Sequence, residues 1–160
     1  MAGPRAATCV FCDDIRAEVG NKVSLMGIFG IDLLSHASGS IVLPKFAVAV
    51  WLIYDIDDAP SHITIRVLVP PNKSEIVKLE AQGSGLREFP YPPDEFSKGT
   101  LRIFVPITNL ILSEEGFIEV MVDTERETLR AGRLRVRFNV PSEEMGLPVN
   151  AASAAAAPPS

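Results

Sequence analysis

The sequence predicts an all-β antiparallel sandwich of eight or nine strands, with a closed barrel as the alternative. Apolar and polar residues alternate with a period of two along most of the chain, and turn signals separate the runs. No stretch of ten or more residues carries the apolar stripe of an amphipathic helix. A chain of 160 residues is long enough to bury the core of one domain, and its 47% hydrophobic content excludes a disordered chain.

The first predicted element is an extended apolar run at residues 7–12, which continues directly into the charged stretch 13–18. A Gly-Asn-Lys turn follows at 20–22, and a second apolar run at 23–29 ends at Gly30. This arrangement predicts a two-stranded unit with charged residues at its rim.

Four charged residues of this unit, Asp13, Asp14, Arg16 and Glu18, form the first candidate site. Paired carboxylates can act as acid and base or bind a cation. The alternative, which we favour, is a strand end at which Asp14, Arg16 and Glu18 share one face and make ion pairs with one another.

The two cysteines, Cys9 and Cys12, have the C-x-x-C spacing of redox motifs. Such motifs usually open a helix, whereas these residues lie in an extended run, where residues three apart point to opposite faces. We therefore expect free thiols that do not pair with each other. Zinc needs about four ligands, and the sequence offers no second Cys or His cluster.

Later strands are indicated by alternation at 62–69, 76–80, 101–105, 118–123 and 133–138, while residues 106–115 leave room for a short helical turn. Residues 46–54 are apolar on both faces, which is typical of a central strand and includes the single Trp51. The predicted core consists of the inward positions of the alternating runs, together with residues of the central strand: Val48, Val50, Trp51, Leu52, Ile65, Val67, Ile103, Val120, Val122 and Val136.

A second acidic cluster, residues 55–58, contains three carboxylates, and Pro60 follows it. Such a cluster can hold Ca²⁺, which takes six or more oxygen ligands. The glycine spacing of an EF-hand is absent, so we favour a solvated hairpin tip.

A row of arginines at 133, 135 and 137, with Arg126 and Arg130 nearby, predicts one basic face that could track phosphates. Acidic residues at 119, 123, 125 and 127 allow the alternative of cross-strand ion pairs within a hairpin. We favour ion pairs, because the net charge is −5 and no aromatic residues are interleaved with the arginines.

Reactive groups are sparse in this chain. The only histidines are His36 and His62, and we find no combination of nucleophile, base and orienting group. The glycines at 27–30 and 83–85 lack the lysine and the helix of a P-loop. The sequence therefore predicts neither an enzyme nor a bound cofactor or metal.

Two segments lie outside the predicted strands. Residues 82–99 form a long loop with three prolines and the aromatic residues Phe89, Tyr91 and Phe96, which are candidate partner contacts or, alternatively, a cap on the sandwich. Residues 141–160 lose the alternation and end in Ala, Pro and Ser, so we expect a domain at 1–140 and a disordered tail.

The stretch Phe-Cys-Asp-Asp-Ile-Arg at 11–16 with Glu18, followed by Lys22, Ser24 and Gly27, resembles a family of short bacterial proteins of unknown function. The likeness continues more loosely through residues 43–44 and 116–117. The pattern Gly-Phe-x-x-x-Val-x-Val from Gly116 is also similar to the sixth strand of immunoglobulin-like domains, with Phe117 in place of the usual Tyr. The resemblance implies an immunoglobulin-like fold and no known activity.

These observations predict a non-catalytic interaction module that binds an unknown protein partner or itself, without nucleic acid. The alternative is a domain that binds a cation or small ligand, or a weak hydrolase, through the acidic clusters at 13–18 or 55–58. No run approaches the roughly 18 apolar residues of a membrane helix. The N-terminus lacks the apolar core of a secretory signal, which predicts a cytoplasmic protein.

Overall fold

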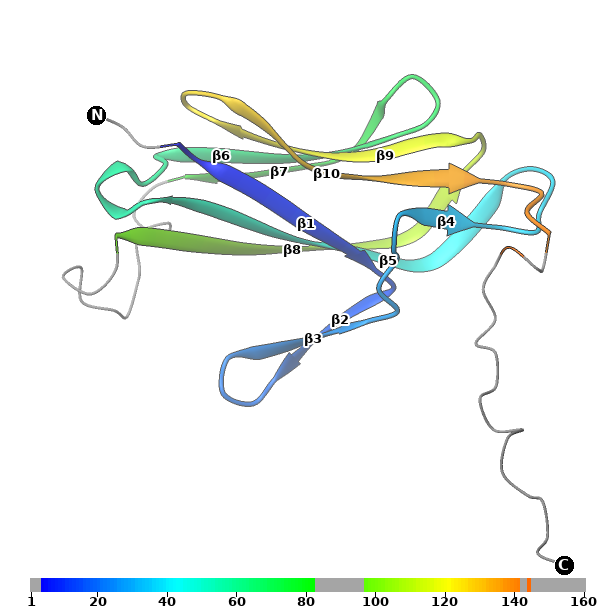
Figure 1. Cartoon of the computed structure of the whole chain (residues 1–160), viewed down its shortest axis with the longest axis horizontal. Coiled ribbons are helices and arrows are strands. Elements are labelled where there is room, and N and C mark those ends of the chain that lie inside the picture. Colours follow the sequence, from blue (N-terminus) through cyan, green and yellow to red (C-terminus); the bar gives the residue numbers. More distant parts are fainter. Residues whose placement is uncertain (1–3, 83–96, 142–143, 145–160) are drawn as a thin grey trace, which may run out of the picture.

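Strands dominate the computed structural model, which describes residues 4–82, 97–141 and 144 (Figure 1). The ten strands of these residues are β1 (Ala6–Cys12), β2 (Asp14–Glu18), β3 (Lys22–Met26), β4 (Asp32–Leu34), β5 (Ile41–Asp55), β6 (His62–Val69), β7 (Ser74–Gln82), β8 (Lys98–Leu112), β9 (Gly116–Thr124) and β10 (Thr128–Arg137). One 3-10 turn, η1 (Ile56–Asp58), follows β5.

Two sheets pack face to face around the core, as Figure 1 shows, which confirms the predicted sandwich. One sheet has the order β1-β5-β8 and the other has the order β4-β10-β9-β6-β7. Without β4, these orders correspond to strands A-B-E and G-F-C-C′ of immunoglobulin-like domains. All neighbours are antiparallel except β4 and β10, which are parallel.

Two details differ from the prediction. The strand count exceeds eight or nine because the predicted run 7–18 divides into β1, which pairs with β5, and β2, which pairs with β3, and because the short strand β4 is added before β5. Residues 106–112 belong to β8 and form no helical turn, because their pairing with β5 continues without a register shift as far as the pair Leu112 and Ile41.

The core between the sheets contains the inward positions that alternation predicted, with two differences. Val48, Val50, Leu52, Ile65, Val67, Val120, Val122 and Val136 are buried members of the core. Ile103 is only partly buried, because β8 lies at the edge of its sheet. Trp51 is not in the core: its neighbours Val50 and Leu52 point inward, so a period of two turns Trp51 to the outer face, where it is partly buried.

The β2–β3 hairpin leaves the sandwich at the end of β1 and projects from it (Figure 1). The Asp13 amide donates to the Met26 carbonyl at 2.9 Å, and the Phe29 amide donates to the Phe11 carbonyl at 2.9 Å. Gly27 has a φ of +63°, and a Cβ there would overlap the Asp13 carboxylate. This junction therefore requires glycine at position 27.

Several predictions fall outside the part of the chain that the structure describes. They concern the partner contacts Phe89, Tyr91 and Phe96, and the tail beyond Pro141 except Glu144. Among the described residues, no helix is long and apolar enough to cross a membrane.

Candidate functional site

The acidic residues of the hairpin are engaged with basic and hydroxyl side chains. Asp14 Oδ2 lies 3.2 Å from Lys45 Nζ and 3.5 Å from Arg16 Nε. Glu18 instead accepts a hydrogen bond from the Ser24 hydroxyl at 2.9 Å. The structure thus brings Asp14 and Arg16 together and adds Lys45, while Glu18 has a separate partner.

The charge state of Asp14 follows from these contacts. The hydrogen bond from Lys45 holds the pKa of Asp14 below its usual value, against a smaller opposing effect of desolvation. A carboxylate that is ionised and bound to Lys45 is a poor general base, because a base works best with a pKa near the operating pH. The hairpin carboxylates therefore favour a structural role.

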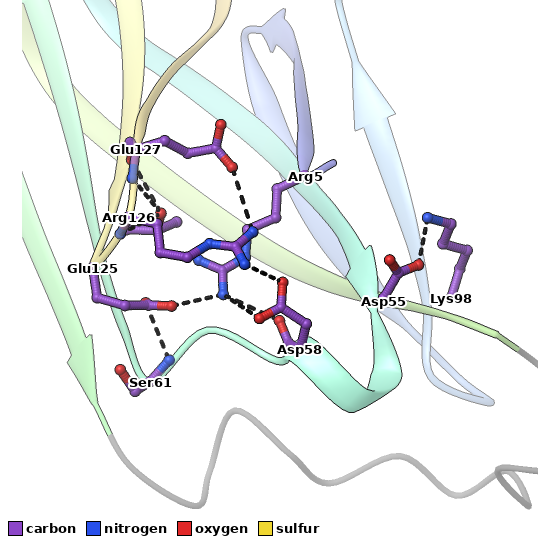
Figure 2. Close-up of polar contacts among 9 residues, drawn as sticks. Arg5, Asp55, Asp58, Ser61, Lys98, Glu125, Arg126 and Glu127 are labelled. Atoms are coloured by element: carbon purple, nitrogen blue, oxygen red, sulfur yellow. Dashed lines mark hydrogen bonds and ion pairs between the residues drawn. The ribbon is translucent and has the colours of Figure 1, made fainter. Parts of the chain in front are cut away.

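The acidic residues 55–58 hold cationic side chains rather than an open site. Asp55 pairs with Lys98, and Asp58 Oδ2 lies 2.7 Å from Arg126 Nη1 (Figure 2). Asp57 is exposed. In the described part of the chain, no group of three or more His, Cys, Asp or Glu side chains is placed to hold a metal ion.

A buried arginine that the motif analysis missed lies at the centre of this cluster. The side chain of Arg5 is 0% exposed, and its Nη2 lies 2.6 Å from Glu125 Oε1 and 3.1 Å from the Asp58 carbonyl (Figure 2). Glu125 Oε2 also accepts from the Ser61 amide at 3.3 Å. Arg5, which immediately precedes β1, therefore connects the start of this strand to the η1 turn and to the β9–β10 turn. We call these contacts the Arg5 cluster.

Glu125 has an unusually acidic carboxyl group in this cluster. Desolvation raises its pKa, but the hydrogen bond and the charge of Arg5, with backbone donors, outweigh desolvation and lower the pKa to about 2. The carboxylate is ionised at any physiological pH and holds Arg5 in place. Such an arrangement stabilises the fold and offers no proton for catalysis.

We expect acid to weaken the fold through Glu125. Its folded pKa is depressed, so its contribution is complete above the ordinary glutamate pKa of about 4.5 and disappears as the pH falls towards about 2. Because the side chain is 33% exposed, we discount the shift and expect a loss on the order of 2 kcal/mol. The check is a melting series from pH 6 to pH 2 on the native chain and on Glu125→Gln. The two stability curves should converge at low pH, and parallel curves would contradict the assignment.

The arginine row lies on the outer face of the five-stranded sheet, where Arg135 and Arg137 pair with carboxylates and Arg133 lies over an aromatic ring. Arg135 makes two hydrogen bonds of 2.7 Å to Asp32. Arg137 pairs with Glu144, and Arg133 lies 4.7 Å from the ring centre of Phe117. The acidic partners of Arg135 and Arg137 therefore come from β4 and from Glu144, and not from the neighbouring strand β9.

The histidines have local partners. His36 Nδ1 lies 2.9 Å from the Val140 carbonyl, and His62 Nε2 lies 3.0 Å from the Thr64 hydroxyl. The two are separated in the fold, since His62 begins β6 and His36 lies between β4 and β5. Neither contact links a histidine to a nucleophile and an orienting carboxylate.

Cys9 and Cys12 are free thiols that lie on opposite faces of β1. Cys9 packs against the core beside Gly132, where a Cβ would come within 2.5 Å of its sulfur. Burial raises the pKa of Cys9 to about 12 and also raises the pKa of Cys12. Both thiols are therefore protonated and poorly reactive at neutral pH.

We expect thiol titration to find both cysteines free. The unfolded, non-reduced protein should react with two equivalents of a thiol reagent. The native protein should react slowly, because Cys12 is buried, Cys9 is partly buried and both thiols are protonated. Finding none in the unfolded protein would overturn the strand assignment of β1.

The outer face of the three-stranded sheet is the strongest candidate surface. Its members alternate with core residues on the same strands and stand in cross-strand rows: Ala6, Ile53 and Thr100; Thr8, Trp51 and Arg102; Val10, Ala49 and Phe104; Cys12, Ala47 and Pro106. Arg102 is the only charged residue among them. We call these residues the apolar outer face.

The other sheet has an outer face of opposite character. Arg66 binds Asp123 with hydrogen bonds of 2.6 and 3.0 Å, and Lys73 lies 2.8 Å from Glu119. A face covered with ion pairs is typical of a solvent-exposed sheet. The apolar outer face, in contrast, has a composition that contact with water alone does not account for.

The β2–β3 hairpin lies next to the apolar outer face. Strand β2 contacts β5 and β8. Near its base, Cys12, Ala47 and Ala49 are almost completely buried although they point away from the core. Further along the same face, Trp51 and Phe104 are partly exposed and Ile53 is 38% exposed. The hairpin thus borders the open part of the surface.

Sequence reasoning missed this face and interpreted its signal differently. The uninterrupted apolar run at 46–54 predicted burial on both faces, which is correct for a strand with a layer on each side. In the described residues, only one layer covers β5, so its second apolar face is left open beyond the hairpin. The signal in the sequence for this second apolar face was the large aromatic residue Trp51 between Val50 and Leu52.

Fold and surface together define an immunoglobulin-like β-sandwich with a hairpin inserted after its first strand and one apolar face that the described elements leave partly uncovered. Residues 7–137 match the model of a family of unknown function, DUF6941, and the chain belongs to this family. No curated protein matches the chain.

Proposed function

We propose that this domain is a non-catalytic interaction module whose apolar outer face binds a protein surface. The carrying observation is the contrast between the two outer faces. One is covered with ion pairs. The four central rows of the other contain a single charge, Arg102, with Asp55 and Lys98 in the row at one end and Lys45 in the row at the other. Partly exposed Trp51 and Phe104 supply the large aromatic contact area that is enriched at protein interfaces.

The proposal that the module is non-catalytic is supported by the engagement of its reactive groups. Asp14, Asp58 and Glu125 hold Lys45, Arg126 and Arg5. Of the two thiols, Cys12 is buried and Cys9 is partly buried, and burial raises the pKa of both. The alternative function, binding of a cation or small ligand or weak hydrolysis at the acidic clusters, has less support for the same reason. The proposed absence of nucleic-acid binding is supported by the partners of Arg135 and Arg137.

The proposed setting is the cytoplasm of a bacterium. Free cysteines are typical of a reducing compartment, and the sequence around residues 11–27 resembles short bacterial proteins. A partner in this setting would present an apolar surface that matches the open part of the sheet around Trp51.

The proposed function can be tested with a photo-crosslinking amino acid at position 51 in cells of the native host. The matched control carries the same amino acid at Met121, which points outward on the ion-paired face and is also partly buried. We expect a discrete adduct with a protein from position 51 and none from position 121. Equal labelling from both positions, or none from position 51, would contradict the assignment of this face.

A further inference from the structure

The free edge of β8 is the second surface that lacks a neighbour. Within the described residues, β8 pairs only with β5, and it runs for 15 residues along the border of the three-stranded sheet. A long edge strand presents unpaired N–H and C=O groups that can template pairing with another strand. Natural edges are usually shortened, bulged, charged or interrupted by proline.

The position of Pro106 shows which β8 groups face the free edge. Proline has no N–H, and in sheets it occupies positions whose N–H side faces away from the neighbouring strand. Pro106 stands opposite Ala47, and the register to β5 is uninterrupted from here to Lys98. By alternation, the N–H and C=O groups of Thr100, Arg102 and Phe104 also face the free edge.

The stretch from Thr100 to Val105 is the unprotected part of this edge. Lys98, which pairs with Asp55, lies before it, and Pro106 ends it. Asn109, with a φ of +51°, marks the point at which the inward side of β8 changes from odd to even residues. The protective features thus bracket six residues that offer a regular antiparallel edge.

We infer that two copies of this chain pair through β8, antiparallel, around a two-fold axis at Ile103. In this register Arg102 stands opposite Phe104 of the partner subunit, and Thr100 stands opposite Pro106 of the partner subunit. Each of the three edge-facing N–H groups then finds a carbonyl. The three-stranded sheets of the two copies then form one continuous six-stranded sheet. The interface is self-complementary, and the two-fold axis closes the assembly at a dimer.

The side chains favour this register over its neighbours. Arg102 is exposed and has no ion pair in the described chain, and a place beside Phe104 of the partner subunit gives its guanidinium an aromatic ring. An axis at Arg102 would put two like charges directly opposite each other. An axis at Phe104 would put Arg102 opposite Pro106 of the partner subunit, which leaves its guanidinium without an aromatic ring directly opposite.

This inference concerns the edge of the sheet and can fail without the proposed function. Residue 51 lies on the central strand β5, so a photo-crosslinker there reports on the face. Cysteines on β8 report on the edge. The two sets of experiments therefore give separate answers.

The test compares Ile103→Cys with Leu101→Cys under mild oxidation. At the axis, the two Cα atoms of residue 103 form a non-hydrogen-bonded pair about 4.5 Å apart, which a disulfide can span. The two Cα atoms of residue 101 are four residues out of register, about 14 Å apart. We expect a covalent dimer from Ile103→Cys and none from Leu101→Cys or from the native chain. Equal yields from both variants, or no dimer from a folded Ile103→Cys, would overturn the inference.

A second variant keeps the test decisive if Ile103→Cys does not fold. Phe104→Pro removes an edge-facing N–H and leaves the ladder to β5 intact, as Pro106 already does. Sedimentation should find the native chain dimeric and Phe104→Pro monomeric, with unchanged far-ultraviolet circular dichroism. The matched control Phe104→Ala removes the ring from the apolar outer face but keeps the edge-facing N–H, and it should still form the dimer. A monomeric native chain at the highest soluble concentration, or a folded dimeric Phe104→Pro, would overturn the inference.

Discussion

Val120→Asp is expected to abolish folding. Val120 is 0% exposed on β9, where it stands opposite Val67 on β6 and Gly132 on β10. No cationic side chain is among its register neighbours, so the carboxylate would be charged without a partner or protonated in a dry core. The cost is on the order of 5 kcal/mol, which is comparable with the whole stability of a small domain.

The matched control for this substitution is Met121→Asp, one residue further along β9. Met121 points to the outer face, where its register neighbours are Arg66 and Arg130. A carboxylate there has water and two arginines nearby, so the variant should remain folded. The measurement is the soluble yield and the thermal melt of both variants by circular dichroism. A soluble Val120→Asp protein that melts cooperatively would show that the register of β9 is wrong.

Arg5→Met should lower the free energy of unfolding by about 3 kcal/mol, the low end of the range for breaking a buried ion pair. The substitution keeps an apolar side chain of similar length but removes the donor to Glu125 and to the Asp58 carbonyl. We choose the low end because Asp58 and Glu125 are 25% and 33% exposed and regain water. Two buried nitrogens of Arg5, Nε and Nη1, have no hydrogen-bond partner among the described residues, and losing them offsets part of the penalty.

Arg126→Met is the control for the buried arginine. Its side chain is 32% exposed and lies 2.7 Å from Asp58, so the same chemical change should cost less than about 1 kcal/mol. Urea unfolding of both variants at pH 7 provides the comparison. Equal losses would mean that burial of Arg5 is not the cause. The Arg5→Met protein should also lose most of the acid sensitivity that Glu125 confers.

The strands and their inward faces could be predicted from the sequence because alternation is a local property. Ile63, Ile65 and Val67 repeat with a period of two, and all three are buried. The same logic explains Val120 and Val122 on β9. A strand must place alternate residues on opposite faces, so pattern alone assigns the core side once one face is more apolar. The count of strands was less accurate, because β4 has three residues and carries no alternation signal.

The outcome for Trp51 depended on tertiary structure. Alternation turns Trp51 to the face of β5 that Val50 and Leu52 do not occupy. Whether a second layer covers that face depends on where the other strands lie. Segments far apart in sequence decide this, since β1 and β8 flank β5 and β2 contacts both β5 and β8. A run that is apolar on both faces therefore specifies a strand, and only the assembled sheets decide whether both faces are buried.

The sequence by itself determined the β class of this protein and the inward residues of most strands. It also predicted free thiols, because Cys9 and Cys12 are three residues apart in an extended run. Only the tertiary structure decided that Arg5 is buried against Glu125, 120 residues away, and that the described elements leave the outer face around Trp51 partly open. The physical reason is the range of the interactions. Alternation and turn chemistry act between neighbours in the chain, whereas ion pairs and the covering of a sheet depend on contacts that exist only after the two sheets have packed.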